Sequence, residues 1–111
     1  MNTPVVFLKS AKEDLKELKN YIVKNFGKDA WLISYNKIKE SASTIQAFPL
    51  RGSIPEELEN LNLTAYRQVI SGMNRIIYQI RQDAIYIHII CDTRKSMESL
   101  LARRLLGATN R

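Results

Sequence analysis

The spacing of apolar residues predicts an amphipathic helix near the start of the chain. Between Ser10 and Gly27 apolar residues recur every three or four positions, which places them along one stripe of a helix: Ala11, Leu15, Leu18 and Ile22. Ser10 and Glu13 have the spacing of a capping box, so we expect their side chains to bond free N–H groups at the helix start. Gly27 is a typical C-terminal stop.

A second helix is expected directly after the first. Asp29 is its expected N-cap, Phe48-Pro49 should end it, and its apolar stripe is Trp31, Tyr35, Ile38, Ala42 and Ile45. A turn of two or three residues separates the two helices, so they should pack as an antiparallel hairpin that covers one shared apolar face. We expect that face to be a sheet.

Four runs rich in β-branched and aromatic residues predict the strands of this sheet: 4–8, 66–70, 75–80 and 85–91. Ser71-Gly72 and Gln82-Asp83 supply turns, and such short connections make the last three strands an antiparallel meander. A last helix is expected over 96–106, stopped by Gly107. The order β-α-α-β-β-β-α indicates one α+β domain over residues 1–111, with the helical hairpin packed on an antiparallel sheet.

Composition and charge add a direction to this picture. The 111 residues are 45% hydrophobic and 25% charged, which is ordinary for a globular protein with one core. The net charge of +6 indicates an acidic partner, such as nucleic acid or an acidic protein surface. Basic and acidic residues number nine and eight in 1–60, three and two in 61–93, and five and one in 94–111. Most of the net charge therefore lies in the last eighteen residues, in Arg94, Lys95, Arg103, Arg104 and Arg111.

Few residues offer catalytic or metal-binding chemistry. A single cysteine, Cys91, excludes an intramolecular disulfide, and with His88 as the single histidine there is no ligand set for zinc or an iron–sulfur cluster. The N-terminus is neither a signal peptide nor a membrane span, so a cytoplasmic protein is expected. Because His88 and Cys91 are three positions apart on a strand, they should lie on opposite faces and form no catalytic pair unless a bulge intervenes.

Basic residues interrupt or follow the predicted strands: Arg67, Arg75, Arg81, Arg94 and Lys95. An arginine on a strand can hold a phosphate or carboxylate. Equally, Arg67 and Arg75 can form salt bridges to the acidic segment 56–59. Tyr66 and Tyr78 are better explained as core and sheet-edge aromatics than as platforms that stack on bases.

Several motifs follow one another in a characteristic order: Ala11-x-x-Asp14-Leu15, Tyr21-Ile22, Phe48-Pro49-Leu50-Arg51-Gly52, Tyr66-Arg67, Arg75-Ile76-Ile77-Tyr78-Gln79-Ile80, Ile89-Ile90-Cys91-Asp92-Thr93-Arg94 and Leu100-Leu101-x-x-Arg104-Leu105. In this order and spacing the chain resembles the RelE/ParE superfamily of toxin–antitoxin toxins nearly end to end. The resemblance implies a helical hairpin over an antiparallel sheet, in agreement with the pattern described above.

The resemblance implies one of two activities. RelE-like members cleave messenger RNA in the ribosomal A site, with an acid/base group in the C-terminal segment, whereas ParE-like members inhibit DNA gyrase. No tyrosine or histidine follows Arg94, and the segment 53–59 is acidic where RelE carries lysines. These differences favour the ParE branch, which implies a growth-inhibiting gyrase toxin without catalytic residues, of the kind found in plasmid stabilisation.

Two alternatives stay open. One is a ribosome-dependent mRNA endoribonuclease, in which Arg67, Arg75 and Arg94 bind the scissile phosphate and Tyr78 or His88 carries the proton. The other is an inactive relative that binds a partner without toxicity.

The resemblance also implies an acidic cognate antitoxin in a hetero-oligomer, and it implies no cofactor or metal. A disordered acidic chain that folds on a basic, partly apolar surface is steered by charge and buries a large area. One expected contact is the apolar groove between hairpin and sheet. The residues expected to bind the target or the antitoxin are Arg67, Arg75, Arg94, Lys95, Arg103 and Arg104.

Overall fold

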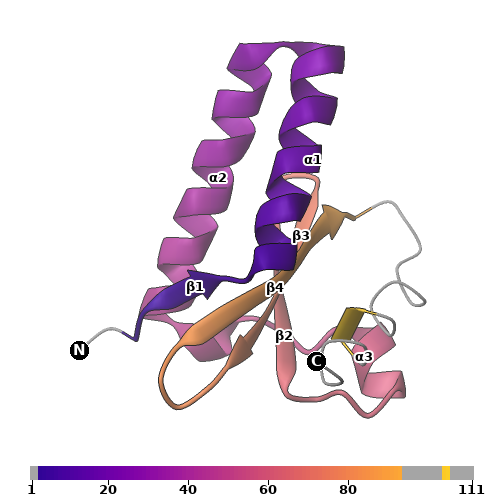
Figure 1. Ribbon diagram of the computed structural model, residues 1–111. Helices are drawn as coiled ribbons and strands as arrows, with labels where there is room; N and C mark the ends of the chain where they lie inside the picture. Colours follow the sequence, from indigo (N-terminus) through magenta and orange to yellow (C-terminus); the bar gives the residue numbers. More distant parts are fainter. Residues whose placement is uncertain (1–2, 94–103, 106–111) are drawn as a thin grey trace.

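The computed structural model describes residues 3–93, 104 and 105, and these form the predicted α+β arrangement of a helical hairpin over one sheet (Figure 1). The elements are β1 (Val5–Phe7), α1 (Lys9–Phe26), α2 (Lys28–Ala47), the 3-10 turn η1 (Pro49–Arg51), α3 (Glu56–Asn60), β2 (Tyr66–Ser71), β3 (Asn74–Ile80) and β4 (Ile85–Asp92). Of the last helix predicted over 96–106, Arg104 and Leu105 are helical and the rest lies outside the described residues. None of the described helices is long and apolar enough to cross a membrane.

The sheet has the strand order β1-β4-β3-β2. The predicted antiparallel meander of β2, β3 and β4 is confirmed, since short turns bring each strand back beside the one before. β1 pairs with β4 in parallel, from Val5 opposite Ile85 to Phe7 opposite Ile87. β1 and β2 are therefore the edge strands, and β1 flanks only the first part of β4.

The helix ends follow backbone connections more than side-chain caps. The predicted capping box is wrong: α1 starts at Lys9, and its N-cap residue, Leu8, makes no side-chain bond. The Leu8 N–H bonds the Ile87 carbonyl at 3.1 Å, so the exit from β1 sets where α1 begins. Asp29 is also not a cap, because α2 starts one residue earlier, and its carboxylate lies in the first turn, where the helix dipole favours it. Gly27 ends α1 as predicted, with a φ of 93°.

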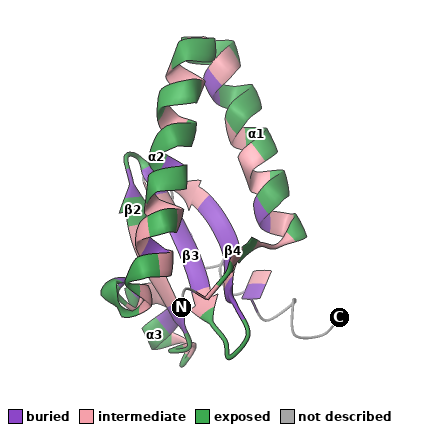
Figure 2. Cartoon of the chain, turned by 90° about the vertical axis from the view of Figure 1, so that its left-hand side faces the viewer, coloured by how far each residue is buried: buried purple, intermediate pink, exposed green. Residues whose placement is uncertain are grey.

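Each face of the sheet has its own apolar cluster, and purple ribbon along β3 and β4 in Figure 2 marks the buried strands between them. The cluster on the hairpin face comprises Ala11, Ile38, Ile45, Ile76, Tyr78, Ile85, Ile87 and Ile90. The smaller cluster on the opposite face comprises Leu58, Tyr66, Ile77, Ile89 and Leu105. Alternate residues of one strand thus serve two cores, which explains the long apolar runs in β3 and β4.

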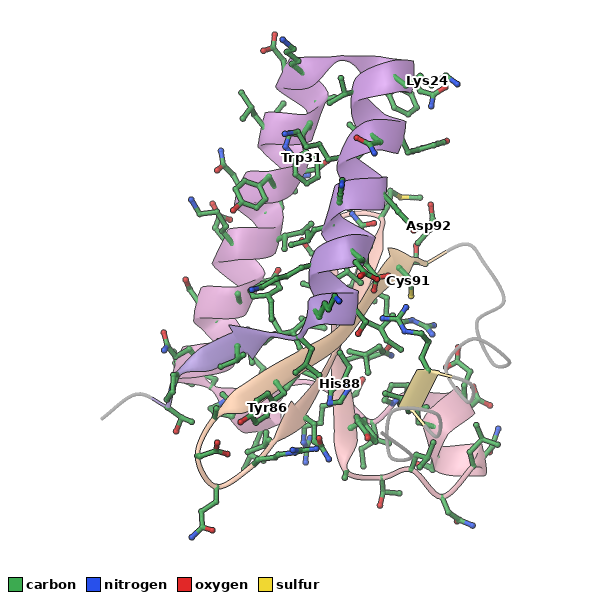
Figure 3. All side chains as sticks on the ribbon, in the orientation of Figure 1. Lys24, Trp31, Tyr86, His88, Cys91 and Asp92 are labelled. Atoms are coloured by element: carbon green, nitrogen blue, oxygen red, sulfur yellow. The ribbon has the colours of Figure 1, made fainter. Side chains whose placement is uncertain are left out.

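A bulge in β4 corrects one prediction. The pairing of β3 with β4 shifts by one residue between Ile77 and Tyr78, which makes His88 an extra residue of β4. The ring of His88 packs edge-on against Tyr66 at a centroid distance of 5.1 Å, and Cys91 contacts the cluster that contains Tyr66. His88 and Cys91 therefore lie on the same face of the sheet, not on opposite faces (Figure 3).

Candidate functional site

Tyr78 anchors the loop 48–52 that follows α2. Its side chain is 0% exposed. The hydroxyl donates to the Pro49 carbonyl at 2.7 Å and accepts the Gly52 N–H at 3.1 Å. Burial raises the pKa of Tyr78, although the Gly52 N–H and the charge of Arg67 act in the opposite direction. Tyr78 is thus a neutral, fully hydrogen-bonded core residue, as the sequence predicts.

Arg67 holds the same loop from β2. Its Nη1 donates to the Gly52 carbonyl at 2.6 Å and to the Leu50 carbonyl at 3.2 Å. The predicted salt bridge from Arg67 to the segment 56–59 is therefore wrong. Gly52 has no room for a side chain, since a Cβ would meet the Tyr78 hydroxyl and lie 2.6 Å from the Gln68 carbonyl oxygen. Held in this way, the loop presents Leu50 to solvent with 71% of its surface exposed.

Arg75 forms the other predicted ion pair, which is confirmed. Its Nη1 lies 2.6 Å from Glu57 Oε2, and both side chains are mostly buried. Burial raises the pKa of Glu57, but the hydrogen bond from Arg75, a backbone hydrogen bond and the positive charge together lower it below the ordinary value. Glu57 lies on α3, a helix that the sequence pattern did not predict because five residues are too few to show a period.

Arg104 binds Asp14 and the main chain of β4. Its two terminal nitrogens donate to the two carboxylate oxygens of Asp14 at 3.1 Å each, and Nη2 also donates to the His88 carbonyl at 3.0 Å. Asp14 in turn accepts the Ile90 N–H at 3.0 Å. Arg104, expected to face a partner, is engaged inside the molecule.

His88 is too weak a base, and Cys91 too fully protonated a thiol, for the two to act as a base and a nucleophile. Burial, together with the charges of Arg81 and Arg104, lowers the pKa of His88 to about 4. His88 Nε2 lies 3.2 Å from the Gln79 side-chain oxygen, which can only accept, so Nε2 carries the hydrogen of a neutral ring. Burial raises the pKa of Cys91 to about 11, which keeps the thiol protonated.

A groove of about 600 Å³ lies between α2 and the edge of β2. Lys37 and Glu40 line it from α2, Arg51 from the loop, and Val69 and Ser71 from β2. This α2–β2 groove is the counterpart of the predicted groove between hairpin and sheet, but charged and hydroxyl groups line it as well as apolar ones.

The structure separates the predicted arginines. Arg67 pairs with Tyr78 across β2 and β3, and its side chain holds the loop beside the hairpin-face cluster. Arg75 contacts α3, whose Leu58 belongs to the opposite face. Arg94, Lys95 and Arg103 lie outside the described residues. Among residues 3–93, 104 and 105, no three His, Cys, Asp or Glu side chains are grouped to hold a metal ion.

Asp14 and Gly52 complete these arrangements, and no pattern in the sequence gave either of them a role. Both residues belong to motifs that carry the family resemblance, and this was the signal in the sequence that pointed to them. Their partners, Arg104 and Tyr78, are 90 and 26 positions away in the sequence, so spacing alone could not reveal the contacts.

Comparison with known proteins agrees with this architecture. The family model described as the ParE toxin of the type II toxin–antitoxin system parDE matches residues 5–97. The chromosomal ParDE system from P. aeruginosa is 16% identical, with a TM-score of 0.70 over 83% of this chain and 97% of that chain. No curated protein sequence matches the chain.

Two further solved structures are similar. The RelBE2 toxin–antitoxin complex from Mycobacterium tuberculosis is 20% identical, with a TM-score of 0.56 over 83% of this chain and 99% of that chain. The YoeB dimer from Staphylococcus aureus is 26% identical, with a TM-score of 0.57 over 86% and 100%. The chain thus has the RelE/ParE fold. Because the family model matches residues 5–97, which are most of the chain, the chain belongs to the ParE toxin family of type II toxin–antitoxin systems.

Proposed function

We propose that this toxin inhibits DNA gyrase, and so replication, and that a cognate antitoxin neutralises it in the cytoplasm. The observation that carries the proposal is the placement of Arg67 and Arg75. A ribonuclease of this fold needs basic groups that converge on one scissile phosphate. Here one guanidinium holds a loop on the hairpin side and the other is paired with Glu57 beside α3.

The candidate proton carriers support the same proposal. Tyr78 has both its donor and its acceptor engaged by Pro49 and Gly52, and it is completely buried. His88 is neutral, 6% exposed and already bonded to Gln79. General acid–base catalysis requires a group within reach of substrate, with a pKa near the working pH. Neither residue meets this requirement, whereas a toxin that acts by binding gyrase needs no such group.

An antitoxin partner follows from family membership and charge. Two of the similar structures are a ParDE toxin–antitoxin system and a RelBE2 toxin–antitoxin complex. This chain carries a net charge of +6, which attracts an acidic, initially disordered segment and speeds its association.

Two assays on the purified toxin test the target. In the first, gyrase supercoils relaxed plasmid in the presence of increasing toxin, and we expect supercoiling to stop with accumulation of cleaved DNA. In the second, messenger RNA is translated in vitro, and we expect no toxin-dependent cleavage. The opposite pair of results, with supercoiling unaffected and messenger RNA cut on ribosomes, would reject the proposal.

The variant Tyr78→Phe separates the two activities further. It removes the hydroxyl but keeps the ring, so a ribonuclease that used Tyr78 as its proton carrier would lose at least 100-fold in cleavage rate. A gyrase inhibitor would change by no more than the accompanying loss of folded protein. The folded fraction, measured by circular dichroism in the same buffer, provides the correction.

A further inference from the structure

Positive charge stays exposed along the first helix of the hairpin. The arginines predicted to face a partner are partly used inside the molecule, since Arg67 donates to loop carbonyls and Arg75 and Arg104 pair with carboxylates. On α1, in contrast, lysines follow one another at intervals of three, four and three positions: Lys9, Lys12, Lys16 and Lys19. This spacing places them along one side of the helix, and we call them the α1 lysine row.

The α1 lysine row is open to solvent, and Figure 2 shows exposed segments along α1 in green. All four lysines are exposed, and within the described part of the chain none of them forms an ion pair. The other exposed residues between positions 9 and 19 are Glu13 and Glu17. The third carboxylate of this stretch, Asp14, is already paired with Arg104. The exposed surface of the stretch therefore has an excess of positive charge.

The residue types in this stretch favour nucleic acid over a protein surface as the partner. Protein–protein interfaces have a core of aromatic and aliphatic residues, and lysine and glutamate are depleted in them. Between positions 9 and 19, a stretch that the structure describes completely, every exposed residue is a lysine or a glutamate. Lysine is a compact charge on a flexible stem, which suits contacts with phosphate oxygens that do not depend on base sequence.

The length of the α1 lysine row favours a duplex over a single strand. A helix rises about 1.5 Å per residue, so the distance along the helix from Lys9 to Lys19 is about 15 Å. Over that length one strand of duplex DNA presents about four phosphates. Single strands are held largely by bases that stack on aromatic rings, and α1 has no aromatic residue between Lys9 and Lys19.

We propose that the α1 lysine row binds the phosphate backbone of duplex DNA without sequence preference. In the complex with gyrase, this duplex is the DNA segment that gyrase holds, so the toxin contacts the DNA as well as the enzyme. Only this source of the duplex rests on the proposed function, because the contact itself needs no gyrase. Glu13 and Glu17 lie beside the row and repel the phosphates, which limits the affinity.

The salt dependence of DNA binding tests the row directly. The probe is a fluorescent duplex of about 20 base pairs, titrated with purified toxin between about 50 and 200 mM salt and followed by anisotropy. Four phosphate contacts predict that log K falls with log salt with a slope of about −3.6. We expect Lys12→Gln with Lys16→Gln to change this slope to about −1.8 and to weaken binding at the lowest salt at least tenfold.

Two further pairs of substitutions serve as controls. Lys37→Gln with Arg51→Gln makes the same change in net charge at the α2–β2 groove and should weaken binding less than threefold. Glu13→Gln with Glu17→Gln removes the repulsion and should strengthen binding at least threefold. Equal losses from the two pairs of cations would overturn the assignment to α1. A wild-type toxin that does not bind the duplex, or that binds single-stranded RNA of the same length more tightly, would overturn the proposal itself.

A supercoiling assay separates this inference from the proposed function. We expect Lys12→Gln with Lys16→Gln to require at least fivefold more toxin than the wild type for half-inhibition of gyrase, and Lys37→Gln with Arg51→Gln less than twofold more. Undiminished inhibition by the α1 variant would overturn the contact with DNA held by gyrase. Wild-type toxin that binds the duplex but leaves supercoiling unaffected would reject the proposed function and support the duplex contact.

Discussion

The edge along the end of β4 and the edge along β2 are covered in different ways. β1 flanks β4 only up to Ile87, and beyond that point side chains take the place of a strand. Ser10 and Arg104 donate to the His88 carbonyl, and Asp14 accepts the Ile90 N–H. On the other side of the sheet, Ser53 covers β2 at Gln68, and none of the described residues forms a strand along the edge beside Ile70.

This difference shows how a small protein handles unpaired strand edges. Such edges attract other chains, so folded proteins block them with charged side chains or cover them. Here the β4 edge is blocked by an ion pair from α1 and the C-terminal segment. The β2 edge is instead covered by main-chain bonds of Ser53, in a loop that Tyr78 and the non-titrating guanidinium of Arg67 hold in place. The β4 edge should therefore respond to pH and charge, and the β2 edge to steric changes.

The largest effect is expected at Gly52, which supports the covered part of the β2 edge. Gly52→Ala places a Cβ against the Tyr78 hydroxyl and 2.6 Å from the Gln68 carbonyl oxygen. We expect a loss of about 4 kcal/mol in the free energy of unfolding, from overpacking and displaced hydrogen bonds. Urea unfolding measures it, with Ser53→Ala as a control of less than about 0.5 kcal/mol, because Ser53 pairs through its main chain. A loss below about 1 kcal/mol would show that the loop adjusts freely.

Acid should lower the free energy of unfolding through His88, which lies on β4. Its folded pKa is about 4, below the ordinary 6.5, so the unfolded state binds a proton first as the pH falls. The stabilisation is complete above pH 6.5 and is lost between pH 6.5 and 4. Between pH 7 and pH 4 the wild type should lose about 3 kcal/mol more than His88→Gln. Urea unfolding at both pH values measures the difference, and equal losses would contradict the prediction.

Removing the carboxylate of Asp14 should expose the β4 edge. Asp14→Ala leaves the Ile90 N–H and the half-buried Arg104 guanidinium without this partner. We expect a loss of about 2 kcal/mol in the free energy of unfolding, typical of hydrogen bonds to charged groups. The matched control is Glu13→Ala, an exposed carboxylate on the same turn of α1. Similar values for the two variants would mean that the edge does not depend on Asp14.

The smallest effect is expected where the β2 edge is open. Ile70→Pro should cost about 1 kcal/mol, because its N–H makes no bond in the sheet. Val69→Pro, one position earlier, removes an N–H that faces β3 and should cost about 3 kcal/mol. Thermal unfolding of the two variants compares them directly, and equal destabilisation would place the main-chain groups of Ile70 inside the sheet.

Local patterns predicted most of the helices and strands, because the residue types and spacing that define each of them involve residues close together in the sequence. The four-three-four spacing from Ala11 to Ile22 is sufficient for one helix, and Gly27 marks its end. Helix starts were predicted less well, since Ser10 and Asp29 have the chemistry of caps but the connection from β1 and the turn at Gly27 determine the boundaries. The sequence left a bulge near His88 open but did not predict it, because β4 carries apolar residues on both faces and an extra residue makes no clear break in that pattern.

For the candidate site as well, the sequence predicted the residues but not all of their partners. The sequence offered Arg67 and Arg75 as equal candidates for binding a ligand or an ion pair, and only the folded chain shows which partners they have. Arg75 meets Glu57 of α3, as one alternative held, and Arg67 meets the carbonyls of the loop 48–52. Arg67 pairs with Tyr78 across β2 and β3, and Arg75 lies three positions before Tyr78 on β3. Because side chains alternate between the two faces of a strand, the two guanidinium groups lie on opposite faces of the sheet. The number of charges in the sequence does not reveal this.

The sequence by itself determined the hairpin, the strands, the family resemblance and the excess of basic groups, since these depend on residue type and short spacing. Tertiary structure decided which polar groups are used internally and which main-chain groups stay open. Asp14 and Arg104 close one edge across 90 positions of sequence, while the strand order leaves Ile70 at the other edge. Hydrogen bonds act over about 3 Å, so the chain must fold before its free groups are defined.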